Sequence, residues 1–519
     1  MTTAWTDGYQ TTVNYTYGYY RDLSPNYQKF CLLLNGIDVP EQQEETAHCE
    51  LGFGQGLSIV FHASTSLAKF YGTDFNPAHA AHAQQLASQG QIQSHFYDDS
   101  FEELLNRTDL PQFDSISLHG IWSWISHENQ HFILKFIRKY LKPNGIVYIS
   151  YNCLTGWATN MPVRELFHSH FNFNSKSANP LQKVRDALDF SESLLQQNPI
   201  FAQRNPNALT KVEDLKKQNP NYLIHEYLNQ DWQCFSFQQV VRIFEDIKMS
   251  YAGSTDLNYH IENINLTPEN QAFLNRIEHP IFREQCRDYF TNTQFRRDLF
   301  IRGKNQLSPL QVQERTRKIP FVLLNTRENF PENITGLLGT FQLLEDIYTP
   351  IGQIFEKHNY RTLTIAEIEN ELPHLNFSKI LNALVILCQL GLAQPCQTIP
   401  NQQIIEQTQK LNAYILEQAP FHQQYQFLVS PLTGMAISIP HFNQLFYRGL
   451  IVEKLKDAKQ LASYGLNVLH NLGWFVLDEN QQSVIDPEQS LKIIETHAEK
   501  FLATNPLLFA KTLKLFPES

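Results

Sequence analysis

Several features that would assign this chain to a common class are scarce. Its 519 residues include only seven cysteines, and these lie far apart (Cys31, Cys49, Cys153, Cys234, Cys286, Cys388 and Cys396). Because no two of them form a CxxC pair, the sequence argues against a zinc ribbon and against a disulfide framework. We expect reduced, buried thiols and no metal centre.

Excess positive charge and long apolar runs are also lacking. The formal net charge is −11, with lysine and arginine dispersed along the chain, which argues against a phosphate backbone as the main partner. No apolar run reaches the roughly 18 residues that would span a bilayer, and the amino terminus lacks a basic start followed by an apolar core. We expect a soluble, cytoplasmic protein with no nucleic-acid partner and no stable membrane association.

Between residues 48 and 152 the chain alternates between strand-like and helix-like runs. HCEL, KFYGTDF, QSHFYD and FDSISLHG are typical of buried strands, and helical patterns such as PAHAAHAQQLASQG and HENQHFILKFIRKYL separate them. This rhythm predicts βαβ units in a doubly wound α/β sheet, with GIVYISYN as a fifth strand. The whole chain is too long for one core and predicts about two to four domains.

The stretch CELGFGQGLS (residues 49–58) lies where the first predicted strand ends. Gly52, Gly54 and Gly56 can adopt positive φ and let backbone N–H groups approach a ligand closely. Ligands of such sheets bind at the carboxyl ends of the strands, which is where this loop lies. A tight structural turn is the alternative interpretation of the glycines taken alone.

Acidic residues at the ends of the second and third predicted strands favour a ligand site. Asp74 lies 18 positions after Gly56, where an acidic residue reaches a pair of ribose hydroxyls. Asp98 and Asp99 end the third strand, where either carboxylate can accept a hydrogen bond from an adenine amino group. Glu50 precedes the glycines and suits a cationic amino-acid group better than the pyrophosphate of a dinucleotide, which is the competing ligand.

Aromatic residues follow the fourth strand in FDSISLHGIWSWISHENQ. His119, Trp122 and Trp124 are candidate catalytic residues, because aromatic faces attract a cation and an amine nucleophile must lose a proton. The alternative is that the tryptophans belong to the core. Tyr17, within the tyrosine-rich residues 15–20, is a further candidate on a lid over the ligand, unless this segment is an amphipathic helix packed on the sheet.

The glycine loop and the acidic residues resemble the S-adenosylmethionine site of class I methyltransferases. The match rests on E-L-G-x-G-x-G, Asp74 and D-D-S-F. The resemblance implies that residues 50–56 hold the methionine portion, that Asp74 binds the ribose and that Asp98 or Asp99 binds adenine, with His119 beside the cofactor. The N/D-P-P-Y motif of many methyltransferases is absent, which makes methylation of a nucleobase or an amide nitrogen less expected.

Two later motifs narrow the resemblance. H-E-Y-L-N at residues 225–229 and F-R-R-D at residues 295–298, together with LHGIWSWIS, resemble bacterial proteins that join a class I methyltransferase to a methyltransferase regulatory domain, among them rickettsial-type protein lysine methyltransferases. This implies a protein lysine N-methyltransferase (EC 2.1.1.-) acting on a protein such as an outer-membrane or surface protein, and it leaves a homodimer open. A small-molecule methyltransferase and a noncatalytic cofactor-binding regulator remain alternatives.

Three parts are expected. Residues 1–165 form the methyltransferase domain with its lid, residues 166–305 a mostly helical linker and regulatory domain, and residues 306–519 an α+β region. Within the last, residues 345–400 have the element order of a winged helix. Its second helix has almost no basic residues, which favours protein contact over DNA reading. Arg296, Arg297 and Asp298 are expected to form a structural ion-pair group, the alternative being a clamp on an acidic partner.

Overall fold

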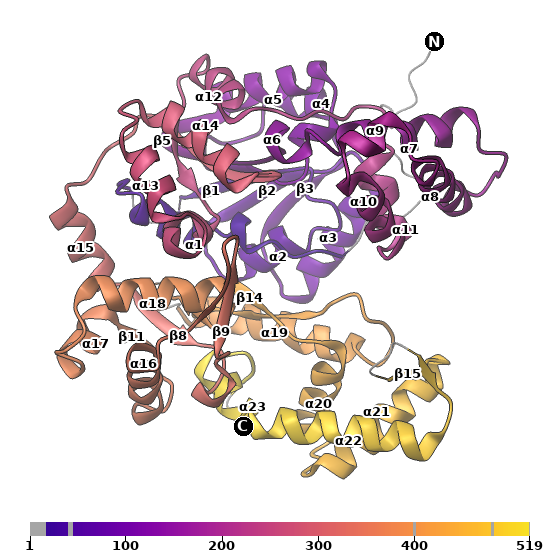
Figure 1. The fold of residues 1–519 in the computed structure, drawn as a ribbon. Helices are drawn as coiled ribbons and strands as arrows, with labels where there is room; N and C mark the ends of the chain where they lie inside the picture. The colour runs from indigo at the N-terminus through magenta and orange to yellow at the C-terminus, as the bar shows by residue number, and fades with distance from the viewer. Residues whose placement is uncertain (1–16, 40–44, 398–400, 479–481, 518–519) are drawn as a thin grey trace.

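The computed structural model describes residues 17–39, 45–397, 401–478 and 482–517. Figure 1 shows a large sheet with helices on both faces in its upper half and the carboxy-terminal part of the chain below it. The sheet has seven strands in the order β3-β2-β1-β4-β5-β7-β6. In chain order these are β1 (Ala47–Leu51), β2 (Lys69–Thr73), β3 (Ser94–Tyr97), β4 (Phe113–Leu118), β5 (Leu141–Asn152), β6 (Ser250–Ser254) and β7 (Phe295–Ile301).

The first five strands form the predicted α/β sheet. They pair in parallel, and β7 pairs antiparallel with both β5 and β6. One face is covered by α1 (Pro25–Leu34), α2 (Leu57–Ser64) and α3 (Pro77–Gln89), and the other by α4 (Phe101–Asn106), α5 (His127–Tyr140) and α12 (Phe237–Glu245). Because both faces are covered, β1 is buried along its whole length.

The sheet does not end at residue 165, where the first domain was expected to end. Strands β6 and β7 come from the segment predicted to be mostly helical, and they complete the sheet beside β5. The sequence FRRDLFI of β7 places charged residues in the interior of a sheet, where such residues are rare. These charges all take part in ion pairs, as described below, which offsets the cost of burying them in a strand.

A helical lobe is inserted between β5 and α12. It has a hydrophobic core of its own, which includes Trp157, Phe167 and Leu188. Its helices are α6 (Leu154–Trp157), α7 (Met161–Phe173), α8 (Pro180–Gln196), α9 (Ile200–Arg204), α10 (Asn207–Lys216) and α11 (Pro220–Tyr227). Between β6 and β7 lie η3 (Leu257–His260), η4 (Glu262–Ile264), α13 (Pro268–Asn275) and α14 (Pro280–Thr291).

The third part begins with α15 (Pro309–Arg317) and a three-stranded sheet, β11-β8-β12. Its remaining elements up to residue 395 are β8 (Pro320–Leu323), β9 (Asn333–Gly336), β10 (Gly339–Gln342), α16 (Glu345–Lys357), β11 (Leu363–Thr364), α17 (Ile365–Glu371), α18 (Phe377–Gln389) and β12 (Ala393–Pro395). The winged helix expected here stays a prediction. Helix α18 packs against η3, α16 and α17, so part of the methyltransferase half covers it.

The last segment docks on the methyltransferase half. Helix α19 (Gln402–Gln418) contacts α2 and α3, and the side chains of Gln407 and Thr408 donate hydrogen bonds of 2.8 Å and 2.6 Å to the carbonyl of Ser64. The elements after it are β13 (Phe427–Ser430), β14 (Met435–Ser438), α20 (His441–Ile451), α21 (Ala458–Leu472), β15 (Val476–Leu477), β16 (Ser483–Val484), α22 (Pro487–Ala503) and α23 (Pro506–Thr512).

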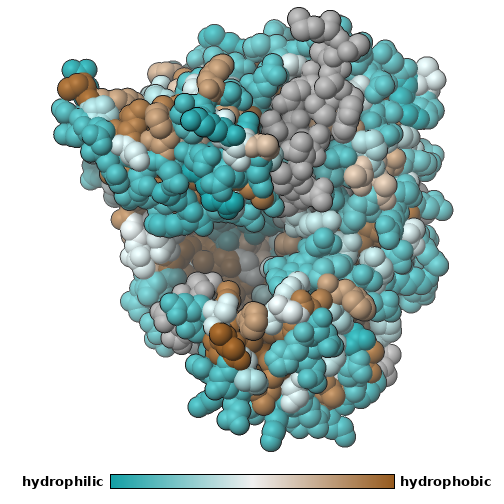
Figure 2. Space-filling view, turned by 90° about the vertical axis from the view of Figure 1, so that its right-hand side faces the viewer, coloured by the Kyte–Doolittle hydropathy of each residue, from teal (hydrophilic) through white to brown (hydrophobic). Residues whose placement is uncertain are grey.

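Figure 2 shows the side of the molecule that carries the helical lobe and β15. This face is hollowed between its upper and lower parts, with hydrophobic residues inside the hollow and mainly hydrophilic ones around it. Within the described ranges, no helix combines the length and the apolar character needed to cross a bilayer.

Candidate functional site

The three glycines after β1 adopt the backbone conformation that was predicted for them. Their φ angles are 71° at Gly52, 57° at Gly54 and 78° at Gly56, all in the left-handed region. A Cβ at Gly52 would lie 2.3 Å from Cδ1 of Ile121. Gly56 caps α2, so the loop leads directly into a helix amino terminus. The left-handed backbone of this loop therefore favours glycine at these positions.

Asp74 connects the end of β2 to this loop. Its Oδ2 accepts a hydrogen bond of 2.8 Å from the N–H of Gly54. Its Oδ1 accepts one of 3.1 Å from the N–H of Asn76 and lies 2.9 Å from Nδ1 of His79. The carboxylate is buried. Asp74 thus contacts the glycine loop directly, and its predicted role in binding a ribose stays a prediction.

The two acidic residues after β3 differ in what they contact. The carboxylate of Asp99 forms an ion pair of 2.8 Å with Arg107. Asp98 is exposed, and no side chain among the described residues forms an ion pair with it. Asp98 is therefore the better candidate to bind a ligand through its side chain.

Glu50 is a buried carboxyl group at the end of β1. Burial, with the neighbouring charge of Asp74, raises its pKa to about 8. Among the described residues no lysine or arginine forms an ion pair with it. A cationic ligand group nearby would offset the cost of ionising this carboxyl, which fits the sequence-based expectation of a ligand with an ammonium group.

His119 follows β4 and is held from two sides. Its Nδ1 lies 2.7 Å from the hydroxyl of Tyr148, and its ring lies against Tyr20, with 3.9 Å between centroids. Burial lowers its pKa to about 4, although the charge of Asp22 opposes this effect. His119 is therefore neutral at physiological pH and can accept or donate a hydrogen bond.

Trp122 and Trp124 lie on η2 (Trp122–Trp124), directly after His119. Trp122 is fully buried and packs against Phe235 and Phe244. Trp124 is 8% exposed, and its indole N–H donates a bond of 3.4 Å to the carbonyl of Glu226. These contacts favour the core interpretation for Trp122, whereas Trp124 lies at the boundary of the site.

Replacing Trp122 with phenylalanine tests this assignment. We expect the free energy of unfolding to fall by about 1 to 3 kcal/mol, because a buried ring loses contacts, while cofactor affinity stays within about twofold. Denaturant unfolding and calorimetry measure the two quantities. A large loss of turnover in a protein of unchanged stability would instead place Trp122 in the catalytic site.

The amino-terminal tyrosines divide between two places. Tyr17 packs edge-on against His82 and Tyr425, between α3 and the carboxy-terminal part. Tyr20, not Tyr17, contacts His119, and its N–H donates a 2.9 Å bond to Ser58 in α2. No contact between Tyr17 and His119 occurs within the described part of the chain. Tyr15 lies outside the described residues.

Arg296 and Arg297 form structural ion pairs. Arg296 is fully buried and binds Asp298 and Asp288, at 2.8 Å and 2.7 Å. Arg297 pairs with Asp22 and Asp256. These contacts support the predicted structural ion-pair group over the clamp on an acidic partner.

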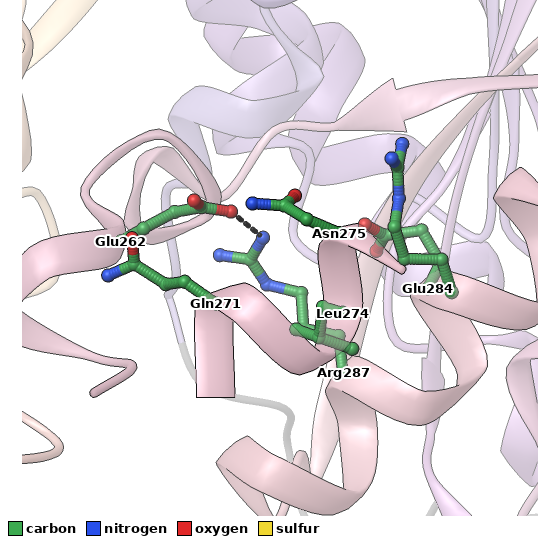
Figure 3. A pocket seen from close by; sticks show the side chains of 7 residues that line it. Glu262, Gln271, Leu274, Asn275, Glu284 and Arg287 are labelled. Atoms are coloured by element: carbon green, nitrogen blue, oxygen red, sulfur yellow. Dashed lines mark hydrogen bonds and ion pairs between the residues drawn. The ribbon is translucent and has the colours of Figure 1, made fainter. Parts of the chain in front are cut away.

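A separate pocket of about 200 Å³ lies between η4, α13 and α14 (Figure 3). Its charged groups satisfy one another in part, since Arg287 forms an ion pair of 2.8 Å with Glu262 and Glu284 lies 3.4 Å from Arg296. The residues lining the pocket are Glu262, Gln271, Leu274, Asn275, Arg283, Glu284 and Arg287. They lie on elements that do not carry the glycine loop.

Two known protein families match parts of this chain. A methyltransferase domain family matches residues 49–147, and a family described as a predicted methyltransferase regulatory domain matches residues 219–302. The latter range includes β6 and β7, so it contributes two strands to the sheet. An uncharacterized protein of Synechocystis, sll1526, is 35% identical over 510 residues, covering 95% of this chain and 94% of that protein.

A solved structure shares the whole fold. PKMT2 from Rickettsia typhi, solved in complex with AdoHcy, has a TM-score of 0.68 and 19% identity, and the match covers 97% of this chain and all of that one. An uncharacterized Rickettsia prowazekii protein, RP789, is 26% identical over 285 residues, which is 54% of this chain and 50% of that protein. The sheet, the helical lobe and the carboxy-terminal part thus occur together in another protein.

Proposed function

Because this chain belongs to the S-adenosylmethionine-dependent methyltransferases that carry a methyltransferase regulatory domain, we propose that it methylates lysine side chains of proteins. The observation that carries the proposal is the likeness to Rickettsia typhi PKMT2 over nearly the full length of both chains. The acceptor is a protein, and the resemblance of the sequence to rickettsial-type enzymes points to an outer-membrane or surface protein. A cytoplasmic enzyme would meet such an acceptor before export.

The residues around the glycine loop fit the cofactor. Gly52, Gly54 and Gly56 leave room for backbone N–H groups to approach it, and the buried carboxyl of Glu50 suits the ammonium of its methionine portion. Asp74, beside the loop, would bind the ribose hydroxyls, and the exposed Asp98 the adenine amino group. When bound, S-adenosylmethionine supplies an electrophilic methyl group on a sulfonium.

The surroundings of His119 suit an amine acceptor. The imidazole is neutral because burial lowers its pKa to about 4, so it places no positive charge beside a sulfonium or an ammonium. Tyr20 and Phe295 add aromatic rings on two sides of the imidazole, with centroid distances of 3.9 Å and 5.9 Å. Aromatic faces stabilise cations and exclude water, which favours the neutral amine that must attack.

Methylation of a bacterial cell-envelope extract tests the function. The full chain is incubated with isotope-labelled S-adenosylmethionine and the extract, and labelled sites are located by mass spectrometry. We expect mono-, di- or trimethylated lysine in a small set of proteins. Label confined to small molecules would contradict the proposal and favour a small-molecule methyltransferase, whose cofactor site would be the same.

A further inference from the structure

A buried amide and a partly buried carboxyl group face each other beside the helical lobe. Asn152 ends β5 and is 2% exposed. Its backbone is fixed on both sides: its N–H donates a 2.9 Å bond to Ser123, and its carbonyl accepts one of 2.9 Å from Phe235. Its side-chain nitrogen Nδ2 is buried, and the amide lies close enough to the carboxyl of Glu226 to lower the pKa of that group.

Glu226 lies on α11 in the H-E-Y-L-N motif. The motif is held in place through its backbone, because Arg164 donates a 2.8 Å bond to the carbonyl of Asn229 and Asn229 donates one of 2.6 Å to the carbonyl of His225. Burial raises the pKa of Glu226 to about 7, while the side-chain amide of Asn152 opposes this effect. Among the described residues, no lysine or arginine lies within ion-pair distance of this carboxyl.

Aromatic contacts connect this pair to His119. Trp124, on η2 after β4, binds the backbone of Glu226 and packs against Phe295, whose ring lies 5.9 Å from that of His119. On the other side, Tyr222 lies close enough to both Glu226 and Tyr20 for their charges to affect its pKa. Tyr20 itself lies against His119. The rings of Trp124, Phe295, Tyr222 and Tyr20, called the aromatic wall below, thus extend from Glu226 to His119.

We infer that Glu226 and Asn152 form the acceptor site, in which the carboxylate of Glu226 binds the ammonium of a lysine side chain and takes its proton. Asn152 would hold that carboxylate in place through its side-chain amide. This inference rests on the proposed protein lysine methylation. It assigns to the regulatory-domain region, residues 219–302, a direct role in the chemistry.

The proposed step is the methylation of an amine, in which atoms and charges balance. The lysine ammonium gives one proton to the Glu226 carboxylate, and the neutral nitrogen then forms a bond to the methyl carbon. The carbon–sulfur bond breaks, its electron pair stays on sulfur, and S-adenosylhomocysteine leaves. The methylated nitrogen retains the positive charge, and Glu226 releases its proton to water. Free lysine has a pKa of about 10.4, so desolvation by the aromatic wall must assist this proton transfer.

The charges around Glu226 set the pH at which it can act. Its neighbours with ionisable side chains, taken from every element packed around it, are Arg164, Lys211, Tyr222, Tyr227 and Cys234. Arg164 and Lys211 favour the carboxylate, and burial favours the neutral acid. With a pKa of about 7, the carboxylate fraction rises as pH rises through neutrality. Methyl transfer should therefore rise over the same range.

Glu226→Gln tests the inference in the full-length protein. Glu213→Gln is a matched control, since it removes the same charge from the exposed face of α10 in the same lobe. Methylation of lysine in the envelope extract and of a single-lysine synthetic peptide is followed with labelled cofactor between pH 6 and 9, and cofactor affinity is measured by calorimetry. We expect Glu226→Gln to lower kcat/KM for the acceptor by about tenfold or more and to remove the rise near neutral pH. Cofactor affinity should change by less than about twofold.

The outcomes separate the two claims. If wild-type protein labels lysine and Glu226→Gln labels it with the same rate and pH profile, the acceptor-site inference is wrong and the proposed function stands. If wild-type protein labels no lysine, both the proposed function and the acceptor-site inference are wrong. Asn152→Ala should also lower acceptor turnover without weakening cofactor binding. Calorimetry also reveals whether Glu226→Gln fails to fold. In that case Glu226→Asp tests the role of Glu226 in proton transfer, because it keeps a carboxylate on a shorter side chain. We expect partial activity from this variant.

Discussion

Replacing Gly54 with valine should abolish binding of S-adenosylmethionine. Gly54 has a φ of 57°, a conformation that is a genuine outlier for a β-branched residue. Its N–H donates a hydrogen bond to the carboxylate of Asp74. A change of backbone conformation would therefore also displace Asp74, the residue predicted to bind the ribose. We expect the cofactor Kd to rise by about 100-fold or more, since about 1 to 3 kcal/mol of strain adds to the lost contacts.

Gly391→Val is a suitable control for this prediction. Gly391 also has a positive φ, of 73°, but it lies in the carboxy-terminal part, where an added Cβ would meet no heavy atom within 4 Å. The Gly391→Val variant should be less stable than the wild-type protein because of backbone strain, but its cofactor affinity should not change. Isothermal calorimetry and thermal denaturation of both variants distinguish a local effect from global unfolding. Wild-type affinity in the Gly54 variant would refute the assignment of the glycine loop.

The backbone geometry of the glycine loop was predictable because its signals are local. Residues 50–56 form one loop, and positive φ at three glycines follows from their lack of a Cβ. Asp74 lies at the end of the next strand, and parallel strands bring such ends to one edge of the sheet. The alternation of strands and helices also predicted β1 to β5. The sequence did not reveal the ion pair of Asp99 with Arg107, which is the reason to prefer Asp98 as the residue proposed to bind adenine.

The residues proposed here for the acceptor site were not predictable in the same way, because they meet only through tertiary packing. Tyr20 was one of several similar tyrosines, and only its position against His119 distinguishes it from Tyr17. Glu226 lies more than 100 residues after His119, on a helix outside the sheet. Its motif was visible in the sequence, but its proximity to Asn152 was not. Trp122 resembled a ligand-binding residue because composition alone does not reveal burial.

Replacing Arg296 with alanine should cause a large loss of stability. Arg296 is fully buried, donates to Asp298 and Asp288, and lies over the ring of Phe237 at 4.1 Å. Its removal leaves two buried carboxyl groups without their cation, so we expect the free energy of unfolding to fall by about 3 to 5 kcal/mol. Denaturant unfolding at pH 7.5 measures this change. Arg297→Ala is the control: this side chain on the same strand is 29% exposed, whereas that of Arg296 is 0% exposed, so its loss should have a smaller effect.

The uncompensated charge, rather than the lost side-chain volume, should account for most of the Arg296 effect. Adding Asp288→Asn and Asp298→Asn to Arg296→Met should therefore recover part of the lost stability, because neutral amides cost less to bury than carboxylates. If the triple variant is no more stable than Arg296→Met alone, lost packing accounts for most of the effect instead. Arg296 pairs with Tyr151 across β7 and β5, next to Asn152. The glycine loop follows β1, which is separated from β5 by β4, so the folded fraction of Arg296→Ala should lose acceptor turnover before it loses cofactor affinity.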